Sequence, residues 1–379
     1  MKFRLLTVMV AFSALILFGY IMMTRRQESH EFDQLKAVRP QNVHRLSAAE
    51  NADKLKVVQP ENAATEEIKE DDNRSSKLSS KNADDEILRY VAVNNSFLIG
   101  EEFNLDVPTK IMLQNVLMNQ TFKRRPVSID PEASFFDIVV PVTGASSNHY
   151  GEFTANIKHF SNNFPGIKVI FYDLGLENSQ VIQVKSLPFV TYRKLNFDDY
   201  PSHVRNLHTY AWKPLIIQQV LTEFDGVMWF DTSVEFQANT DLVLERMARV
   251  KSGILFYVGT TGHSILAATN PGMLKYFPMT TADAVTDMFQ ASAMIILNTE
   301  DVQKHIMKWL CVCAFKQECI APPGSQLYCG PSVRQRDKYA GCHRFDQALI
   351  NILAKNLYGA EDERYSLSGE EEFAIMNRM

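Results

Sequence analysis

Short, predominantly apolar runs alternate with longer amphipathic segments from residue 135 to residue 357. Strands that are buried on both faces read as such runs. Helices that separate them are typical of a parallel sheet covered on both sides. The pattern predicts a single α/β domain over residues 135–379, with a mostly parallel central sheet flanked by helices.

The order of elements follows from the same pattern. Apolar runs predict strands at 135–142, 167–176, 187–195, 226–236, 253–258 and 291–298. Apolar positions at helical spacing predict helices at 152–164, 214–224, 242–250, 301–315 and 345–357. The chain contains no internal repeat, so we expect one sheet rather than a repeated architecture.

The amino-terminal segment contrasts with this domain. Residues 5–23 are uncharged and mostly apolar, and their length suits one helix across a bilayer. A cleaved signal peptide is the alternative, but the apolar run is long for one and no Ala-x-Ala-like site ends it. We expect a type II membrane protein with a cytosolic tail at 1–4, a transmembrane signal-anchor at 5–23, a flexible polar stem at 24–100 and a transitional segment at 101–134.

Two features indicate a lumen of the secretory pathway. Asn-x-Ser/Thr glycosylation acceptors lie after the anchor at Asn73, Asn94 and Asn119. All five cysteines cluster near the end of the chain, which favours local disulfides in an oxidising compartment. The disulfide candidates are Cys311, Cys313, Cys319, Cys329 and Cys342. Their odd number leaves one thiol free or paired with another chain, and a zinc site without a Cys-x2-Cys pair is the alternative.

The first apolar run leads into VVPVTGASSNHYG at 139–151, which resembles the nucleotide loop of a short-chain dehydrogenase. That loop needs glycines where the backbone approaches a pyrophosphate, but this chain has Asn148, His149 and Tyr150 there. No tyrosine lies four residues before a lysine, so the catalytic Tyr-x-x-x-Lys pair of those enzymes is absent. A Rossmann-type methyltransferase would also want a glycine-rich loop. What remains is a polar loop at the ligand edge of the sheet, or an ordinary helix cap.

Charged side chains follow other predicted strands and begin other helices. Asp231 ends an apolar run and suits a divalent cation together with Ser233, although it could instead cap a turn. Lys213 lies at the start of a helix and suits an anion, or is a solvated surface lysine. His343 and Asp346 enter the last helix, where they could act as metal ligand and general base or be structural.

Six ordered motifs carry a resemblance over residues 135–357: TGASSNHYGE, FYDLGL, YAWKPLII, WFDTSVEF, CIAP and CHRFDQALINIL. The chain resembles an invertebrate, largely nematode, family of anchored, glycosyltransferase-like proteins that is classed as a domain of unknown function. More loosely, the order of elements is similar to a GT-A-type nucleotide-sugar transferase. Such enzymes hold a metal with an Asp-x-Asp motif, of which Asp231 matches the first aspartate and Ser233 replaces the second. His343 and Asp346 lie where the late polar group near the diphosphate is expected.

The resemblance implies a Golgi-type glycosyltransferase that moves a sugar from a nucleoside diphosphate sugar to a glycan, glycoprotein or glycolipid. The implied donor-binding residues are Thr143, Ser146, Asn148, His149, Asp173 and Lys213. The implied metal, Mn²⁺ or Mg²⁺, would be held by Asp231, Ser233 and His343, and the catalytic residues would be Asp346 and His343. The alternative is a catalytically inactive carbohydrate-binding or scaffold membrane protein of the same fold. A formal net charge of −5 gives no basic surface for a nucleic-acid partner.

Overall fold

The computed structural model describes residues 103–118, 134–236, 240, 243, 245, 252–359, 362–367 and 374–376. All of them lie within one compact unit, Asn73–Met379. The predicted anchor, the stem and the three glycosylation acceptors lie outside the described residues. None of the helices in the described part is long and apolar enough to cross a membrane.

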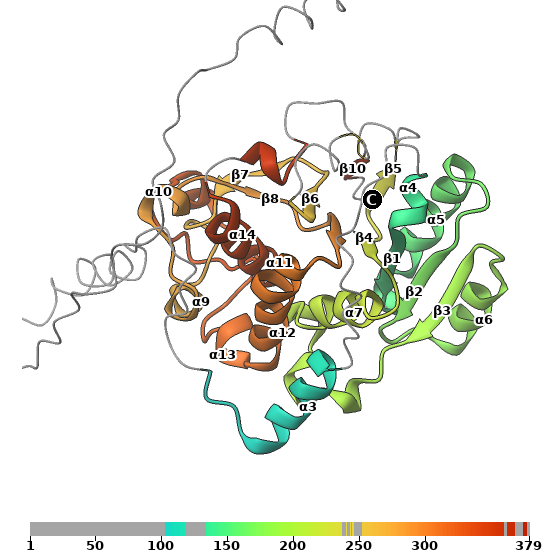
Figure 1. Cartoon of the computed structure of the whole chain (residues 1–379), viewed down its shortest axis with the longest axis horizontal. Helices are drawn as coiled ribbons and strands as arrows, with labels where there is room; N and C mark the ends of the chain where they lie inside the picture. Colours follow the sequence, from blue (N-terminus) through green and yellow to red (C-terminus); the bar gives the residue numbers. More distant parts are fainter. Residues whose placement is uncertain are drawn as a thin grey trace, which may run out of the picture. The chain divides into compact units, whose positions relative to one another are not determined.

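The core of this unit is a six-stranded sheet with the order β3-β2-β1-β4-β9-β6 (Figure 1). Its strands are β1 (Val140–Ala145), β2 (Val169–Asp173), β3 (Val190–Lys194), β4 (Gly226–Phe230), β6 (Ile254–Phe256) and β9 (Ala293–Leu297). The pairs among β1, β2, β3 and β4 are parallel, and only β9 runs against its two neighbours. The α/β class with a mostly parallel central sheet is therefore confirmed.

The connections of β1 create a switch point in the sheet. From β1 the chain moves outward through β2 to β3, and it then returns to place β4 against the other side of β1. In that pairing Val142 lies opposite Trp229. Chain connections therefore leave β1 and β4 in opposite directions, and such a point opens a crevice at the carboxyl ends of the strands.

Helices cover both faces of the sheet, because its strands are apolar on both faces. On one face, Val227 and Trp229 pack into a core that includes α7 (Trp212–Leu221), α12 (Lys308–Phe315) and α14 (Phe345–Tyr358). On the other face, Met228 and Phe230 pack with α5 (Tyr150–Asn163). The Phe160 ring of α5 stacks on Phe230 at a centroid distance of 5.6 Å. This two-sided burial is what the continuous apolar runs predicted.

Smaller elements complete the described part of the chain. Two further sheets are formed by β5 (Val234–Phe236) with β10 (Ala374–Met376) and by β7 (Thr260–Ser264) with β8 (Asp287–Phe289). The remaining α-helices are α3 (Val107–Met118), α4 (Phe135–Ile138), α6 (Asn178–Ser186), α9 (Pro271–Tyr276), α10 (Thr281–Ala284), α11 (Glu300–Val302) and α13 (Gln317–Ile320). A π-helical turn, η5 (Gln303–Met307), joins α11 to α12. The sequence pattern did not predict the two-stranded β7–β8 sheet.

Three predicted elements differ from the structure. The predicted strand at 135–142 begins instead with the helical turn α4, because the Ser134 N–H donates to the Asp137 carboxylate and caps it. The predicted strand at 226–236 is two strands, β4 and β5, which are separated by a turn at Asp231–Ser233. The predicted helix at 242–250 lies almost wholly outside the described residues.

Disulfides account for four of the five cysteines. Cys313 is bonded to Cys319, and Cys329 is bonded to Cys342. Local disulfides are thus confirmed, and the zinc alternative fails because these four sulfur atoms are consumed. Cys311 is the free thiol and is fully buried, so it cannot pair with another chain.

Candidate functional site

The turn that follows β4 is anchored at the switch point. The Asp231 N–H donates to the Ser292 carbonyl at 2.7 Å, and the Val234 N–H donates to the Asp231 carbonyl at 3.0 Å. The Trp229 indole N–H donates to Asp231 Oδ1 at 2.9 Å. The Asp231 side chain nevertheless remains 32% exposed. The fold therefore presents one carboxylate to solvent from a rigid strand end.

Lys213, Asp231 and Asp346 form a cluster of ion pairs, the Lys213 cluster. Lys213 Nζ lies 3.0 Å from Asp231 Oδ1 and 3.1 Å from Asp346 Oδ2, and it donates to the Ala291 carbonyl at 3.3 Å. The contact with Asp346 is an ion pair without hydrogen-bond geometry, which leaves Oδ2 with no hydrogen bond. Lys213 is 4% exposed and Asp346 is 8% exposed, so the solvated-lysine alternative fails.

Burial and charge shift the ionisation of this cluster in a consistent way. Burial would lower the pKa of Lys213, but attraction to Asp231 and Asp346 outweighs it and raises that pKa. Burial raises the pKa of Asp346, and the neighbouring Asp231 carboxylate adds to this effect, whereas Lys213 opposes it. The ammonium is thus held in its charged form, whereas burial disfavours ionisation of the Asp346 carboxyl.

Backbone strain flanks the Lys213 cluster on both sides. Tyr210 has φ 54° and Phe345 has φ 42°, and both are non-glycine residues in a left-handed conformation. Their rings lie 5.9 Å apart. Tyr210 directly precedes the α7 segment that carries Lys213, and Phe345 directly precedes Asp346. Strain of this kind costs about 1–3 kcal/mol per residue and clusters at ligand sites, so this edge of the sheet is the candidate site.

The polar loop after β1 reaches the same turn from the other side. His149 Nδ1 lies 3.0 Å from Glu152 Oε2, and the Thr232 hydroxyl donates to that same oxygen at 3.0 Å. The Asn156 amide donates to the Thr232 carbonyl at 2.6 Å. The two motifs that sequence analysis singled out separately, around His149 and Asp231, therefore border one site.

The other predicted donor-binding residues divide by exposure. Asn148 is exposed and Ser146 is half-buried, and the Ser146 hydroxyl donates to Asn148 Oδ1 at 2.5 Å. Thr143 lies inside β1 with no exposed surface, so it does not fit a ligand contact. Asp173 is also buried, because it accepts the N–H groups of Gly175 and Leu176 and the Tyr192 hydroxyl. These bonds shape the turn after β2 and do not fit the predicted role in donor binding.

His343 does not fit the predicted roles in metal binding and catalysis. Its Nδ1 accepts the Asn270 N–H at 3.1 Å, and its Nε2 lies 3.1 Å from the Ile320 carbonyl. The residue is fully buried, and burial lowers its pKa to about 4. A neutral imidazole with both nitrogens bonded to the backbone has no atom left for a metal or a proton transfer. Ser233 is also buried, in the turn between β4 and β5.

Several site residues were not predicted from the sequence. Glu152, the last residue of the motif TGASSNHYGE, links His149 to Thr232 and was not predicted as a site residue. Tyr210 and Phe345 carry strain that no sequence pattern reveals. Across the parts of the chain that the structure covers, no group of three or more His, Cys, Asp or Glu side chains is placed to hold a metal ion.

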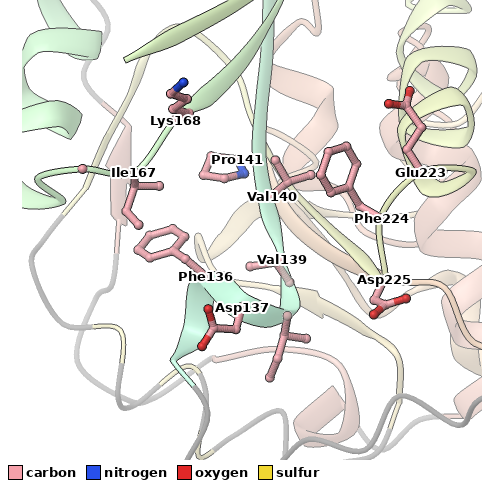
Figure 2. A pocket seen from close by; sticks show the side chains of 12 residues that line it. Phe136, Asp137, Val139, Val140, Pro141, Ile167, Lys168, Glu223, Phe224 and Asp225 are labelled. Atoms are coloured by element: carbon pink, nitrogen blue, oxygen red, sulfur yellow. The ribbon is translucent and has the colours of Figure 1, made fainter. Parts of the chain in front are cut away.

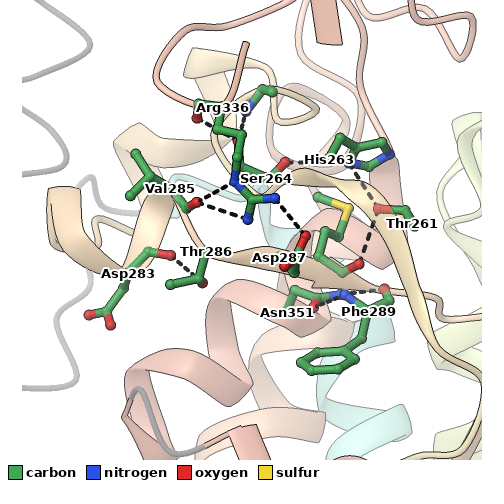
Figure 3. Close-up of polar contacts among 12 residues, drawn as sticks. Thr261, His263, Ser264, Asp283, Val285, Thr286, Asp287, Phe289, Arg336 and Asn351 are labelled. Atoms are coloured by element: carbon green, nitrogen blue, oxygen red, sulfur yellow. Dashed lines mark hydrogen bonds and ion pairs between the residues drawn. The ribbon is translucent and has the colours of Figure 1, made fainter. Parts of the chain in front are cut away.

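A second polar region lies on the two-stranded β7–β8 sheet (Figure 3). Arg336 pairs with Asp287 at 2.8 Å and donates to the Val285 carbonyl. His263 Nδ1 lies 3.0 Å from the Thr261 hydroxyl, whereas its buried Nε2 has no hydrogen-bond partner. Burial lowers the pKa of His263, and the nearby Arg344 charge lowers it further. The Arg336 contacts hold β8 in place, and the environment of His263 disfavours its charged form.

A cavity of about 290 Å³ lies at the opposite edge of the sheet (Figure 2). It is lined near the amino ends of β1 and β4 by residues such as Val140, Phe224 and Asp225. Asp225 lies at the far end of β4 from Asp231. The cavity is therefore separate from the switch-point site and holds none of the predicted site residues.

Comparisons with known proteins give one family match and a set of distantly similar solved structures. Residues 76–218 match the model of a family described as "Protein of unknown function (DUF1647)". A search of curated proteins finds no match. Similar solved structures include the galactosyltransferase LgtC in complex with donor and acceptor sugar analogs, at 13% identity over 57% of this chain and 70% of that chain, with a TM-score of 0.33.

Two further similar structures are also glycosyltransferases. GlyE of Streptococcus pneumoniae is 13% identical over 61% of this chain and 45% of its own, with a TM-score of 0.34. The mannosyltransferase PcManGT from Pyrobaculum calidifontis, in complex with GDP-Man and Mn²⁺, is 11% identical over 50% of this chain and 52% of its own, with a TM-score of 0.26. Similarity at this level assigns no function to this chain.

Proposed function

We propose that the protein is a glycosyltransferase that uses a nucleoside diphosphate sugar as donor and binds it at the carboxyl edge of β1 and β4. We further propose that it is a type II membrane protein of the Golgi or another secretory lumen. The predicted anchor at 5–23 and the two disulfides favour that location. The acceptor would be a luminal glycan, glycoprotein or glycolipid.

One observation carries the proposal: three helices begin around the exposed Asp231 carboxylate at the switch point. The first turn of α5 contributes Glu152, which binds Thr232. The first turns of α7 and α14 contribute Lys213 and Asp346. Each helix start carries partial positive charge and N–H groups that favour a phosphate. Helix starts that favour a phosphate, beside the Asp231 carboxylate with its 32% exposed side chain, suit a diphosphate donor and a hydroxyl acceptor.

The geometry favours Asp231 over Asp346 as the general base. The Asp231 side chain is 32% exposed, whereas the Asp346 side chain is 8% exposed and forms an ion pair with the buried Lys213. In the proposed reaction, the acceptor oxygen bonds to the anomeric carbon while the bond from that carbon to the donor phosphate oxygen breaks. The electron pair leaves with the diphosphate, and the acceptor proton passes to Asp231. Asp346 is then a positioning residue that acts through Lys213.

Ser146, Asn148 and His149 are the donor-binding residues that the structure leaves accessible, and we propose that they contact the nucleotide. They lie on the loop at the start of α5, across the turn from Lys213. Side-chain oxygens and nitrogens of this kind can bind a base or ribose by hydrogen bonds. Thr143 and Asp173 are left out of this role because both are buried.

The test is donor binding and turnover with a matched pair of variants. UDP- and GDP-sugars are screened for binding to the full chain and then for sugar transfer or donor hydrolysis. Asp231→Asn should lower turnover by about 10²–10⁴-fold while the protein stays folded, since a general base contributes about that much. Asp225→Asn, at the other end of the same strand, should leave turnover unchanged. Equal turnover in Asp231→Asn and wild type would contradict the assigned base.

The alternative is a catalytically inactive carbohydrate-binding or scaffold protein of the same fold. The observation that favours it is Ser233, a buried hydroxyl where the resembled enzymes carry a second carboxylate. The same experiment separates the two functions. Sugar binding without turnover in the wild type would favour the inactive protein, whereas turnover that depends on Asp231 would favour the enzyme.

A further inference from the structure

The polar atoms at the switch point do not fit a divalent metal ion. Asp231 Oδ1 already lies 3.0 Å from the Lys213 ammonium and accepts the Trp229 N–H at 2.9 Å. A metal ion on that oxygen would stand about 2.0–2.6 Å from it and would face the positive charge of the ammonium. Both nitrogens of His343 are bonded to backbone groups. The predicted set of Asp231, Ser233 and His343 therefore does not make a metal site.

The Lys213 ammonium occupies the position between carboxylates that such an ion would take. It bridges Asp231, which follows strand β4, and Asp346, in the first turn of α14, and the Ala291 carbonyl lies 3.3 Å from it. The faces of Trp229 and Tyr210 lie 5.5 and 5.6 Å from Nζ and add cation–π attraction. The positive charge is thus built into the fold and fixed in place.

We propose that Lys213 takes the place of a divalent cation at this site, so that the nucleoside diphosphate binds without metal. This inference rests on the proposed function. Without Lys213, the two carboxylates would give this edge a formal charge of −2, and Lys213 reduces it to −1 and so weakens the repulsion of a diphosphate. Because the ammonium lies 3.0 and 3.1 Å from the carboxylates, it screens them at short range. The starts of α5, α7 and α14 supply the remaining positive potential.

The first test measures binding of UDP and of GDP to the full chain by calorimetry, in EDTA and in Mn²⁺. We expect the Kd of the nucleotide that binds to differ by less than about threefold between the two buffers, well under the tenfold change that corresponds to about 1.4 kcal/mol. A loss of affinity in EDTA of tenfold or more would overturn the inference and leave the proposed function standing. Absence of binding of both nucleotides in both buffers would overturn the proposed function, and this inference with it.

A second test uses Asp231→Asn, which keeps the shape of the side chain. If a metal ion bridged Asp231 and the diphosphate, this variant would bind UDP at least about tenfold more weakly. If Lys213 replaces the metal, loss of one carboxylate charge leaves UDP affinity unchanged or makes it tighter, while turnover falls. Asp225→Asn is the matched control, with unchanged affinity expected. Weaker UDP binding by Asp231→Asn alone would contradict the inference.

Discussion

The two sides of the Asp231 turn are built differently. On the α7 and α14 side, Lys213 and Asp346 are almost fully buried and held by ion pairs. On the β1 side, the His149 side chain is 54% exposed, and the loop is held by a few hydrogen bonds near the surface. A buried side fixes charge in one position, whereas an exposed side can contact a ligand. We propose that the buried side positions charge and that the exposed side recognises the donor.

The largest expected effect on stability comes from removing the Lys213 ammonium from the buried side. Lys213→Met leaves Asp231 and Asp346 facing each other with no cation between them, and we expect a loss of about 3–5 kcal/mol in the free energy of unfolding. Urea unfolding measures this loss. Lys158→Met, on the exposed surface of α5, is the control and should change stability by less than about 0.5 kcal/mol. A similar small change in both variants would show that Lys213 is not a fixed part of the fold.

The disulfides provide a second test of the two sides, because Cys329–Cys342 lies next to the buried side in the sequence. Cys329–Cys342 closes a loop with a sequence separation of 13 directly before His343, and Cys313–Cys319 closes one with a separation of 6. Chain entropy predicts a loss of about 3 kcal/mol when the longer loop is opened by a double Cys→Ala change, and about 2 kcal/mol for the shorter. Thermal unfolding of the two double variants compares them. A larger loss for the shorter loop would contradict the entropic account.

Because burial raises the pKa of Asp346, the contribution of this residue to the free energy of unfolding should depend on pH. A carboxyl whose pKa is raised on folding supports stability below its unfolded value, near 3.8, and that support is lost as pH rises through the folded value. We therefore expect the unfolding free energy of wild type, relative to Asp346→Asn, to fall as pH rises from about 3.5 toward 7. Denaturant unfolding of both proteins across that range measures it. A difference that rises with pH would show that Lys213 outweighs burial.

The smallest expected effect on stability belongs to the exposed side. His149→Ala removes a contact with Glu152 in which the His149 side chain is 54% exposed, so we expect a loss of less than about 1 kcal/mol in unfolding free energy. Binding of UDP or GDP should weaken, because His149 is proposed to contact the nucleotide. Ser179→Ala, on the exposed face of α6, is a control for surface substitution. Unchanged nucleotide affinity in His149→Ala would show that His149 does not contribute to nucleotide binding.

Much of the fold was predictable because strand burial has a strong sequence pattern. The apolar runs located β2, β3, β4, β6 and β9, and the helical spacing located α5, α7 and α14. The turn at Asp231–Ser233 was missed because apolar residues continue on both sides of it. The helical turn α4 was missed because its cap, a bond between Ser134 and Asp137, is local and competes with a strand-like run.

The candidate site was predictable only as a set of separate motifs. The sequence indicated Lys213, Asp231 and Asp346 as charged groups near element ends, but it could not show that one ammonium bridges both carboxylates. It also predicted His343 and Asp173 as site residues alongside Asp231, although both side chains form hydrogen bonds with backbone groups inside the protein. Exposure and hydrogen-bond partners depend on residues far apart in the chain, and no local pattern records them.

The sequence by itself determined the α/β class, the order of the main elements and the clustering of cysteines, because periodicity, capping and spacing are local properties. Only the tertiary structure decided which polar residues meet and which of them face solvent. It placed Lys213 against Asp231 and Asp346 by folding α7 and α14 onto the same face of the sheet. The reason is physical: the strength and availability of a charge depend on its burial and its partners, and both are set by packing.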